Sequence, residues 1–215
     1  MINRLRQDLI RSYLDCDREG VHQVFAQAAA AGVGLATFAT KVIEPSFETL
    51  GELWSRGEVA LTQVFVAARA VDLEVAAVEA RAAPLPSDAP KVVLGTLIDA
   101  HGLGARLLSV FLRMAGLQAV EIGSRLTPEE LVDRALREQP QVVAVSCLML
   151  HSAYRMREVS QLLQERAPGV RLVVGGAPFR IDHTLADRVG AESWAPDVIS
   201  GVSVIKSLAA PRAAG

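Results

Sequence analysis

Apolar residues recur at helical spacing throughout the first 80 or so residues. Leu5 and Leu9 lie one turn apart, and Val21 and Val24 begin a second repeat of the same kind. The pattern predicts four helices, of which the last two cover about residues 38–57 and 60–81. Pro45 lies inside the third helix and predicts a kink there, or a division into two pieces. Four helices with short connections indicate a small helical bundle.

After residue 90 the pattern changes to short apolar runs that alternate with amphipathic segments. Strands buried on both faces have this continuous apolar character, and the runs lie at 92–94, 119–122, 142–145, 170–174 and 192–195. Helices are expected between them, at about 104–115, from 127, at 152–166, 183–188 and 198–208. Thr127 and Glu130 form a capping box with Pro128 at the first helical position. Five β–α units predict an α/β domain with a doubly wound parallel sheet.

The segment between these two patterns has no periodicity. Residues 82–90 contain three prolines, which stiffen a chain and remove backbone donors. We therefore expect an interdomain linker at 82–90, with a helical domain at 1–81 and an α/β domain at 91–215.

Composition narrows the class of protein. Apolar residues make up 51% of the 215 residues and charged residues 21%, enough for a buried core. The net charge is -2 and the basic residues are scattered, so no direct nucleic-acid binding is expected. The two cysteines, Cys16 and Cys147, indicate a reducing compartment rather than a disulfide framework. Because neither a signal peptide nor a membrane span is recognisable, we expect a soluble, cytoplasmic protein without membrane contact.

Candidate chemistry is concentrated where the predicted strands end, which is where doubly wound sheets bind ligands. Asp99 and His101 follow the first strand and alternate, so that both side chains point to one side of an extended loop. The aspartate can then accept from one imidazole nitrogen while the other faces a metal. Gly102 and Gly104, on either side of Leu103, allow a tight turn and the close approach of a bulky ligand.

The third and fourth predicted strands end in further small residues. Ser146 and Leu148 follow the third strand, with Ser152 shortly after, and the pair Gly175 and Gly176 follows the fourth. Adjacent glycines remove side chains from the floor of the crevice. Each feature has a simpler explanation: His101, Asp99 and Ser152 as helix caps or loop residues, and the glycines as a turn.

Taken together, these residues resemble the three-part signature of cobalamin-binding domains, found in methionine synthase and in the corrinoid proteins of methyltransferase systems. The three parts are Asp99-x-His101-x-x-Gly104, Ser146-x-Leu148 and Gly175-Gly176. The resemblance implies a flavodoxin-like fold and a cobalamin bound with His101 as the cobalt ligand. It also implies that Asp99 holds the histidine tautomer, that Ser152 extends this relay to Asp99, and that the nucleotide tail passes Ser146, Leu148, Gly175 and Gly176.

The helical domain takes part in the same resemblance. Residues 51–59 are similar to the module that covers the upper face of the corrin, and we expect Trp54, Val64 and Phe65 to shield that face. Cobalamin-dependent light-responsive regulators carry a Glu-His pair at about Val64 and Phe65. Ordinary packing in the bundle core is the alternative for Trp54 and Phe65.

The loop before His101 departs from the methyltransferase proteins. It is one residue shorter, with Ile98 where glycine is usual. The resemblance implies a corrinoid protein that carries a methyl group on cobalt, as methylcobalamin or hydroxocobalamin, between partner methyltransferases. The alternative is a cobalamin-dependent sensor or regulator that acts through a protein partner. A homo-oligomer is compatible with both.

Overall fold

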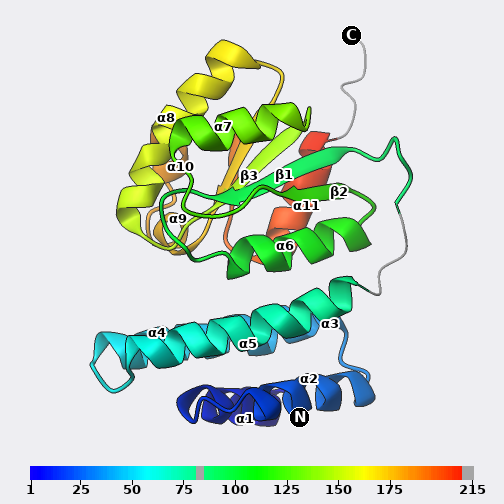
Figure 1. Cartoon of the computed structure of the whole chain (residues 1–215), viewed down its shortest axis with the longest axis vertical. Helices are drawn as coiled ribbons and strands as arrows, with labels where there is room; N and C mark the ends of the chain where they lie inside the picture. Colours follow the sequence, from blue (N-terminus) through cyan, green and yellow to red (C-terminus); the bar gives the residue numbers. More distant parts are fainter. Residues whose placement is uncertain (81–84, 210–215) are drawn as a thin grey trace. The chain divides into compact units, whose positions relative to one another are not determined.

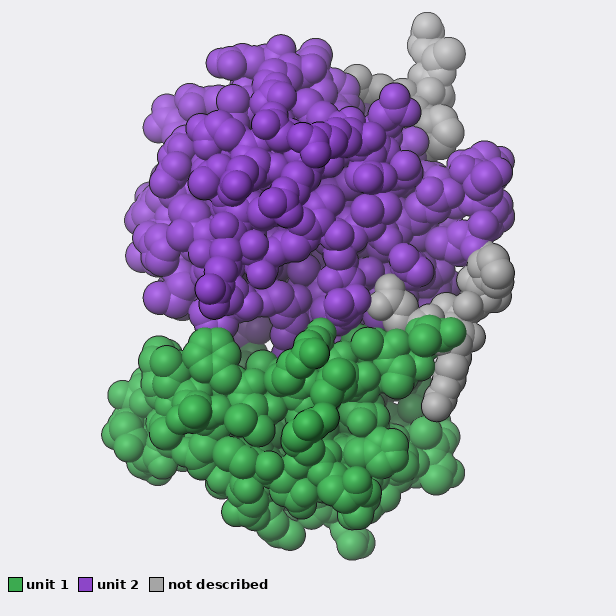
Figure 2. All heavy atoms as spheres, viewed as in Figure 1, with its two compact units in different colours: residues 1–81 green, residues 82–215 purple. Residues whose placement is uncertain are grey.

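The computed structural model describes residues 1–80 and 85–209. The chain forms two compact units, Met1–Arg81 and Ala82–Gly215, shown in green and purple in Figure 2. Residue 81 of the fourth predicted helix and residues 82–84 of the predicted linker lie outside the described residues.

The first unit is helical, as predicted. Its elements are α1 (Ile2–Leu14), α2 (Arg18–Ala30), α3 (Leu35–Phe38), the π-helical segment η1 (Ala39–Ile43), α4 (Glu44–Ser55) and α5 (Leu61–Glu79). Their apolar stripes bury Leu9, Phe38, Leu50 and Val71. Asp17 caps α2 by accepting a hydrogen bond from the backbone N–H of Gly20 at 2.9 Å.

Pro45, at which a kink or a division into two pieces was expected, follows a change from π-helical to α-helical hydrogen bonding within a continuous helical segment. Proline has no N–H to donate to the carbonyl of Lys41, so the α-helical hydrogen-bond pattern cannot continue unchanged. The chain instead forms the π-helical turn η1, which lies just before Pro45 and in which the N–H of Glu44 donates to the carbonyl of Ala39. The hydroxyl of Ser46 donates to the carbonyl of Val42 at 2.7 Å, which satisfies that buried acceptor.

The second unit is a five-stranded parallel sheet with helices on both faces. Its strands are β1 (Lys91–Thr96), β2 (Gln118–Glu121), β3 (Val142–Ser146), β4 (Arg171–Gly175) and β5 (Ser193–Ala195). Its helices are α6 (Leu103–Met114), α7 (Pro128–Arg137), α8 (Leu150–Arg166), α9 (Ala177–Ile181), α10 (Leu185–Arg188) and α11 (Val198–Ala209). The strand order β2-β1-β3-β4-β5 is that of flavodoxin, which confirms the predicted fold.

Alternate residues of each strand face opposite layers of helices. Val93 packs in one hydrophobic cluster with Leu131 of α7 and Met156 of α8. Leu94 packs in a second cluster with Leu112 of α6 and Ile205 of α11. Figure 1 shows α7 and α8 on one side of the sheet and α6 on the other. The continuous apolar runs in the sequence are therefore explained by burial on both faces.

Two element boundaries differ from the sequence prediction in ways that affect the site. Helix α8 begins at Leu150, two residues before the predicted start, and the short helix α9 follows β4 where no helix was expected. Both helices begin at the carboxyl edge of the sheet. Among the described residues, no helix combines the length and apolar character needed to cross a membrane.

Candidate functional site

The three sequence motifs meet at one edge of the sheet. Strands β1 and β3 are neighbours at its centre, and the strand order reverses between them, which is the switch point where flavodoxin-like proteins bind ligands. The last residues of the strands are in register: Thr96 pairs with Ser146, and Ser146 pairs with Gly175. The loops that follow β1, β3 and β4 therefore lie side by side.

Asp99 and His101 form a hydrogen-bonded pair in the loop after β1. Oδ1 of Asp99 accepts from the backbone N–H of His101 at 3.0 Å and lies 3.3 Å from its Nδ1. The carboxylate is buried, with 4% of the side chain exposed, whereas 35% of the imidazole is exposed. The imidazole of His101 therefore lies at the surface and is held by a buried carboxylate. The contact between the two side chains is the one that their alternation in the sequence predicted.

The surroundings of Asp99 favour its charged form. Burial by itself raises the pKa of this carboxyl, but the hydrogen bonds from the side chain and backbone of His101, and from the backbone of Leu148, outweigh it. The pKa of Asp99 is therefore lower than the usual aspartate value. An ionised Asp99 accepts a hydrogen bond from the protonated Nδ1 of His101. In this tautomer the available lone pair is on Nε2.

The expected relay from Ser152 to Asp99 is wrong for this structure. Ser152 is fully buried, and its hydroxyl has no hydrogen-bond partner within the described residues. Since α8 begins at Leu150, Ser152 lies in the first turn of that helix. The second oxygen of Asp99 accepts instead from the backbone N–H of Leu148 at 3.3 Å.

Two glycines of the motifs are required by close packing between the site loops. A Cβ at Gly104 would lie 2.8 Å from the hydroxyl of Ser146. A Cβ at Gly176 would lie 1.9 Å from the carbonyl oxygen of Cys147, and Gly176 has a φ of +109°, which side-chain-bearing residues rarely adopt. These glycines therefore bring the loops after β1, β3 and β4 together.

Other motif residues border open space. A Cβ at Gly102 would meet no atom within 4 Å. Its φ of −80° is one that any residue adopts, so the backbone does not require glycine there. Leu103 begins α6 directly after it, and the side chain of Leu148 is 47% exposed on the neighbouring loop. Gly175 is the last residue of β4, so that the strand ends one residue later than predicted and includes the first glycine of the pair. Gly102 and Leu148 are therefore not closely packed against neighbouring residues at this edge of the sheet.

Cys147 lies between Ser146 and Leu148 but is unsuited to nucleophilic chemistry. It is buried, and burial together with the charge of Asp99 raises the pKa of its thiol to about 12. A thiol that stays protonated is a poor nucleophile and a poor metal ligand.

One contact at the site was missed from the sequence. The hydroxyl of Thr96 is buried and donates to the carbonyl of Asp99 at 3.2 Å. A polar residue at the end of an apolar strand was the available signal. The amide of Leu148, which also holds Asp99, carries no sequence signal because every residue except proline has such a donor.

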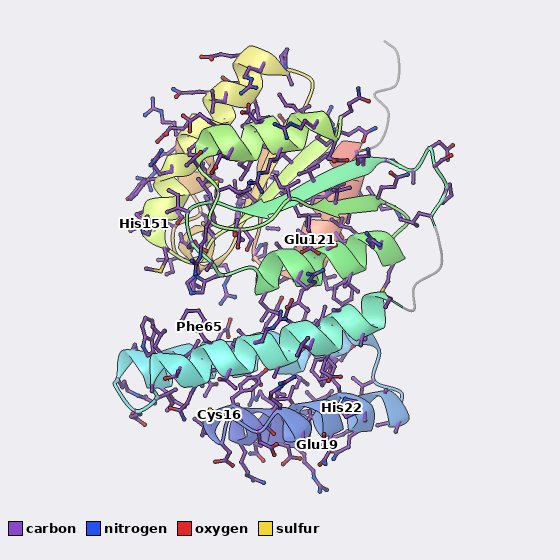
Figure 3. The ribbon with its side chains drawn as sticks, viewed as in Figure 1. Cys16, Glu19, His22, Phe65, Glu121 and His151 are labelled. Carbon is purple, nitrogen blue, oxygen red and sulfur yellow. The ribbon has the colours of Figure 1, made fainter. Side chains whose placement is uncertain are left out.

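The candidate cap residues lie in the first unit. The side chains of Trp54 and Phe65 are 46% and 49% exposed, and Val64 is half-buried. Figure 3 shows Phe65 projecting from α5 on the side opposite to α1 and α2. Exposed aromatic rings are unusual for bundle-core residues, so core packing does not explain them. Their contact with a cofactor stays a prediction.

The donor set suits a metal held within a macrocycle. Within the described part of the chain, no group of three or more His, Cys, Asp or Glu side chains is placed to hold a bare metal ion. His101, oriented by Asp99, would supply a single nitrogen ligand, which suits a metal whose other ligands come from a macrocycle. The open space at Gly102 and the unpartnered hydroxyl of Ser152 also fit a large polar cofactor.

Comparison with known proteins gives the same assignment. Residues 91–201 match the family model described as the B12 binding domain, and residues 5–79 match a second model of the same description. Trimethylamine corrinoid protein 1 of Methanosarcina mazei is 28% identical over 199 residues, covering 90% of this chain and 91% of that protein. Dimethylamine corrinoid protein 3 of Methanosarcina acetivorans is 28% identical over 214 residues, with 96% and 98% covered.

Solved structures share the fold. The monomethylamine corrinoid protein of Methanosarcina barkeri has a TM-score of 0.78 at 20% identity, covering 97% of this chain and all of that one. The methanol:cobalamin methyltransferase complex of Methanosarcina barkeri gives a TM-score of 0.53 at 17% identity, with 96% and 80% covered. Together with the two family models and the geometry at the ends of β1, β3 and β4, these likenesses place the chain in the B12-binding-domain family of corrinoid proteins.

Proposed function

We propose that this protein holds a cobalamin with His101 as the cobalt ligand and carries a methyl group between partner methyltransferases. The observation that carries the proposal is the half-exposed imidazole of His101 at the β1/β3 switch point, oriented by the buried carboxylate of Asp99. When bound, cobalamin supplies a cobalt ion that accepts and releases a methyl group.

The residues of the chain orient and tune the ligand. Asp99 holds the proton of His101 on Nδ1, so that Nε2 keeps the lone pair that a metal requires. The backbone N–H groups of His101 and Leu148 fix the carboxylate in turn. Such hydrogen bonds behind a ligand typically raise its basicity and fix its orientation.

The remaining motif residues are proposed to receive the rest of the cofactor. Ser146, Leu148, Gly175 and Gly176 surround the path of the nucleotide tail, and the buried hydroxyl of Ser152 is a donor for it. Trp54, Val64 and Phe65 are proposed to shield the upper face of the corrin, since two of them expose aromatic rings on the helical unit. Water excluded from that face cannot compete with the methyl group.

The relatives support a carrier over a sensor. Relatives that cover nearly the whole chain are named as trimethylamine and dimethylamine corrinoid proteins, and a fold relative occurs in a complex with a methyltransferase. Methylamines are therefore the first donors to test, together with the methyltransferases of the organism that encodes this protein. The two free cysteines fit a reducing, cytoplasmic location.

Visible spectroscopy tests the proposed ligand. The full chain is reconstituted with hydroxocobalamin or methylcobalamin, beside His101→Ala and the control His151→Ala, whose histidine is exposed in the first turn of α8. We expect the histidine-ligated spectrum in the wild type and in His151→Ala, and its loss in His101→Ala. An identical spectrum in all three would exclude His101 as the ligand.

Methyl transfer itself needs a second measurement. The holo-protein is reduced to cobalt(I) and mixed with a methylamine and a candidate methyltransferase from the same organism, and formation of methylcobalamin is followed by its spectrum. We expect methylation that depends on both the donor and the methyltransferase. If no donor and partner from that organism methylate the reduced protein, the carrier function is wrong, even though cobalamin binding would stand.

A further inference from the structure

The loop that carries His101 is hydrogen-bonded along its length to the loop after β2. The N–H of Thr96 donates to the carbonyl of Gly123 at 3.1 Å, and the N–H of Ile98 donates to the carbonyl of Leu126 at 2.9 Å. In the opposite direction, the N–H of Arg125 donates to the carbonyl of Asp99 at 3.0 Å. A parallel bridge between Leu97 and Leu126 continues the β1–β2 pairing beyond the ends of both strands.

The segment Gly123–Leu126, here called the β2 clamp, has a demanding backbone. Gly123 has a φ of +107° and Arg125 a φ of +60°, both in the left-handed region. Leu126 is buried beside Leu97 in the core. A segment with two such residues keeps its shape only when the surrounding contacts hold it, and these contacts include the backbone hydrogen bonds with Thr96, Ile98 and Asp99.

The β2 clamp holds the main chain of Asp99, and the loop after β3, here called the β3 loop, holds its side chain. The carbonyl of Asp99 accepts from the β2 clamp at Arg125 and from the hydroxyl of Thr96. The carboxylate of Asp99 accepts from the amide of Leu148 in the β3 loop and from His101. With main chain and side chain both fixed, Asp99 has one position from which to orient the imidazole.

We propose that the β2 clamp is a positioning element for the cobalt ligand, although none of its residues belongs to the cofactor-binding motifs. The proposal rests on the proposed function, in which His101 ligates cobalt. Breaking the clamp would let the peptide of Asp99 rotate, and the imidazole would lose the orientation that ligation requires. A substitution at Gly123 would then change the orientation of the His101 imidazole through the backbone of Asp99.

A matched pair of glycine substitutions tests this in the full chain. An alanine Cβ at Gly123 would find only a side-chain nitrogen of Arg134, at 3.8 Å, so Gly123→Ala alters the backbone without a steric clash. Gly116, in the turn between α6 and β2, has a φ of +87° and nothing within 4 Å. Both variants place alanine at a positive φ in open space, and similar losses of thermal stability are expected.

The first measurement is the ratio of histidine-ligated to unligated methylcobalamin, read from the visible spectrum. We expect Gly123→Ala to lower this ratio roughly fivefold or more. Alanine disfavours the left-handed backbone, so the segment relaxes and loses its hydrogen bonds to the loop that carries His101. Gly116→Ala should keep the wild-type ratio. The second measurement is amide hydrogen exchange of residues 97–101 in the cofactor-free protein, which should accelerate in Gly123→Ala alone.

Thr96 gives an independent arm. Thr96→Val keeps the shape of a side chain that is 1% exposed but removes its hydrogen bond to the carbonyl of Asp99. We expect a lower ligated ratio in Thr96→Val and recovery toward the wild-type ratio in Thr96→Ser, which keeps a hydroxyl. If Thr96 acted only through the packing of its methyl group, Thr96→Ser would not restore the ratio of histidine-ligated to unligated cobalamin, because serine lacks that methyl group.

The outcomes separate the inference from the proposed function. If the wild type and His101→Ala give the same spectrum, His101 is not the ligand, and both proposals fail together. If they differ while Gly123→Ala keeps the wild-type spectrum and exchange rates, the β2 clamp does not position the ligand and only this inference fails. Equal losses in Gly123→Ala and Gly116→Ala would also overturn it, because general destabilisation would then be the cause.

Discussion

Ile98, in the loop before His101, has a strained backbone conformation. It has a φ of +65°, a conformation that L-residues and above all β-branched ones avoid. Its N–H is fixed by the carbonyl of Leu126, and its side chain is partly buried against the core on the α7 and α8 side of the sheet. Left-handed backbone costs such a residue about 1–2 kcal/mol. The loop meets this cost at the position where the family resemblance implies glycine.

Substitution at Ile98 should therefore reverse the usual order of glycine and alanine. Both Ile98→Gly and Ile98→Ala lose the same packing, but only glycine adopts the left-handed backbone freely. We expect Ile98→Gly to be more stable than Ile98→Ala by about 1 kcal/mol in urea unfolding. At Ala100, where φ is not positive, the ordinary order should hold, and Ala100→Gly should be less stable than the wild type.

The two cysteines should differ sharply in reactivity. Cys16 is exposed between α1 and α2, whereas Cys147 is buried with a thiol pKa of about 12. Because the thiolate is the reactive form, Cys147 should stay unmodified even at pH 9, where an ordinary thiol ionises. A thiol-reactive chromophore should label one cysteine per native chain, none in Cys16→Ser, and two after denaturation of the wild type. Labelling of native Cys16→Ser at the same rate as the wild type would contradict the burial of Cys147.

At the scale of elements, α7 is determined by its own sequence. The hydroxyl of Thr127 accepts from the N–H of Glu130 at 3.2 Å, and the carboxylate of Glu130 accepts from the N–H of Thr127 at 3.0 Å. Pro128 occupies the first turn, and Leu131 and Val132 are buried against the sheet. The capping box predicted from four consecutive residues is confirmed in full.

Loss of this cap should have a local and moderate effect. Thr127→Ala removes the hydroxyl acceptor and is expected to lower the free energy of unfolding by about 1 kcal/mol. Thr62→Ala is the matched control, since Thr62 is exposed in the first turn of α5 and has no capping bond there. Urea unfolding followed by circular dichroism compares them. Equal effects of the two substitutions would show that the capping box contributes no stability.

At the scale of the whole molecule, every residue proposed to hold the cobalt ligand comes from the second unit, and the proposed shield comes from the first. A ligand that binds only the folded chain stabilises it according to its concentration relative to Kd. Cobalamin binding should therefore be visible as protection against unfolding, without any assay of methyl transfer.

Removal of the cofactor is the corresponding prediction. At a cobalamin concentration about 100 times Kd, the free energy of unfolding should rise by about 2.7 kcal/mol over the cofactor-free protein. Thermal unfolding should shift upward by several degrees, and His101→Ala should lose most of the shift at the same cobalamin concentration. His151→Ala should keep it. A shift that is the same in His101→Ala as in the wild type would mean that the imidazole contributes little to binding.

The sequence by itself determined the five strands and most of the helices, the flavodoxin-like class and the position of the Asp99–His101 pair. These depend on the spacing of apolar residues and on contacts between residues close in the chain, which sequence patterns record directly. Only the tertiary structure decided which groups hold Asp99: the amide of Leu148 and the β2 clamp at Arg125, instead of the hydroxyl of Ser152. In both bonds a backbone N–H donates to Asp99 from a loop about 25 to 50 residues away. Every residue except proline carries the same N–H donor, so the register of the strands, and not the identity of the side chain, selects the partner.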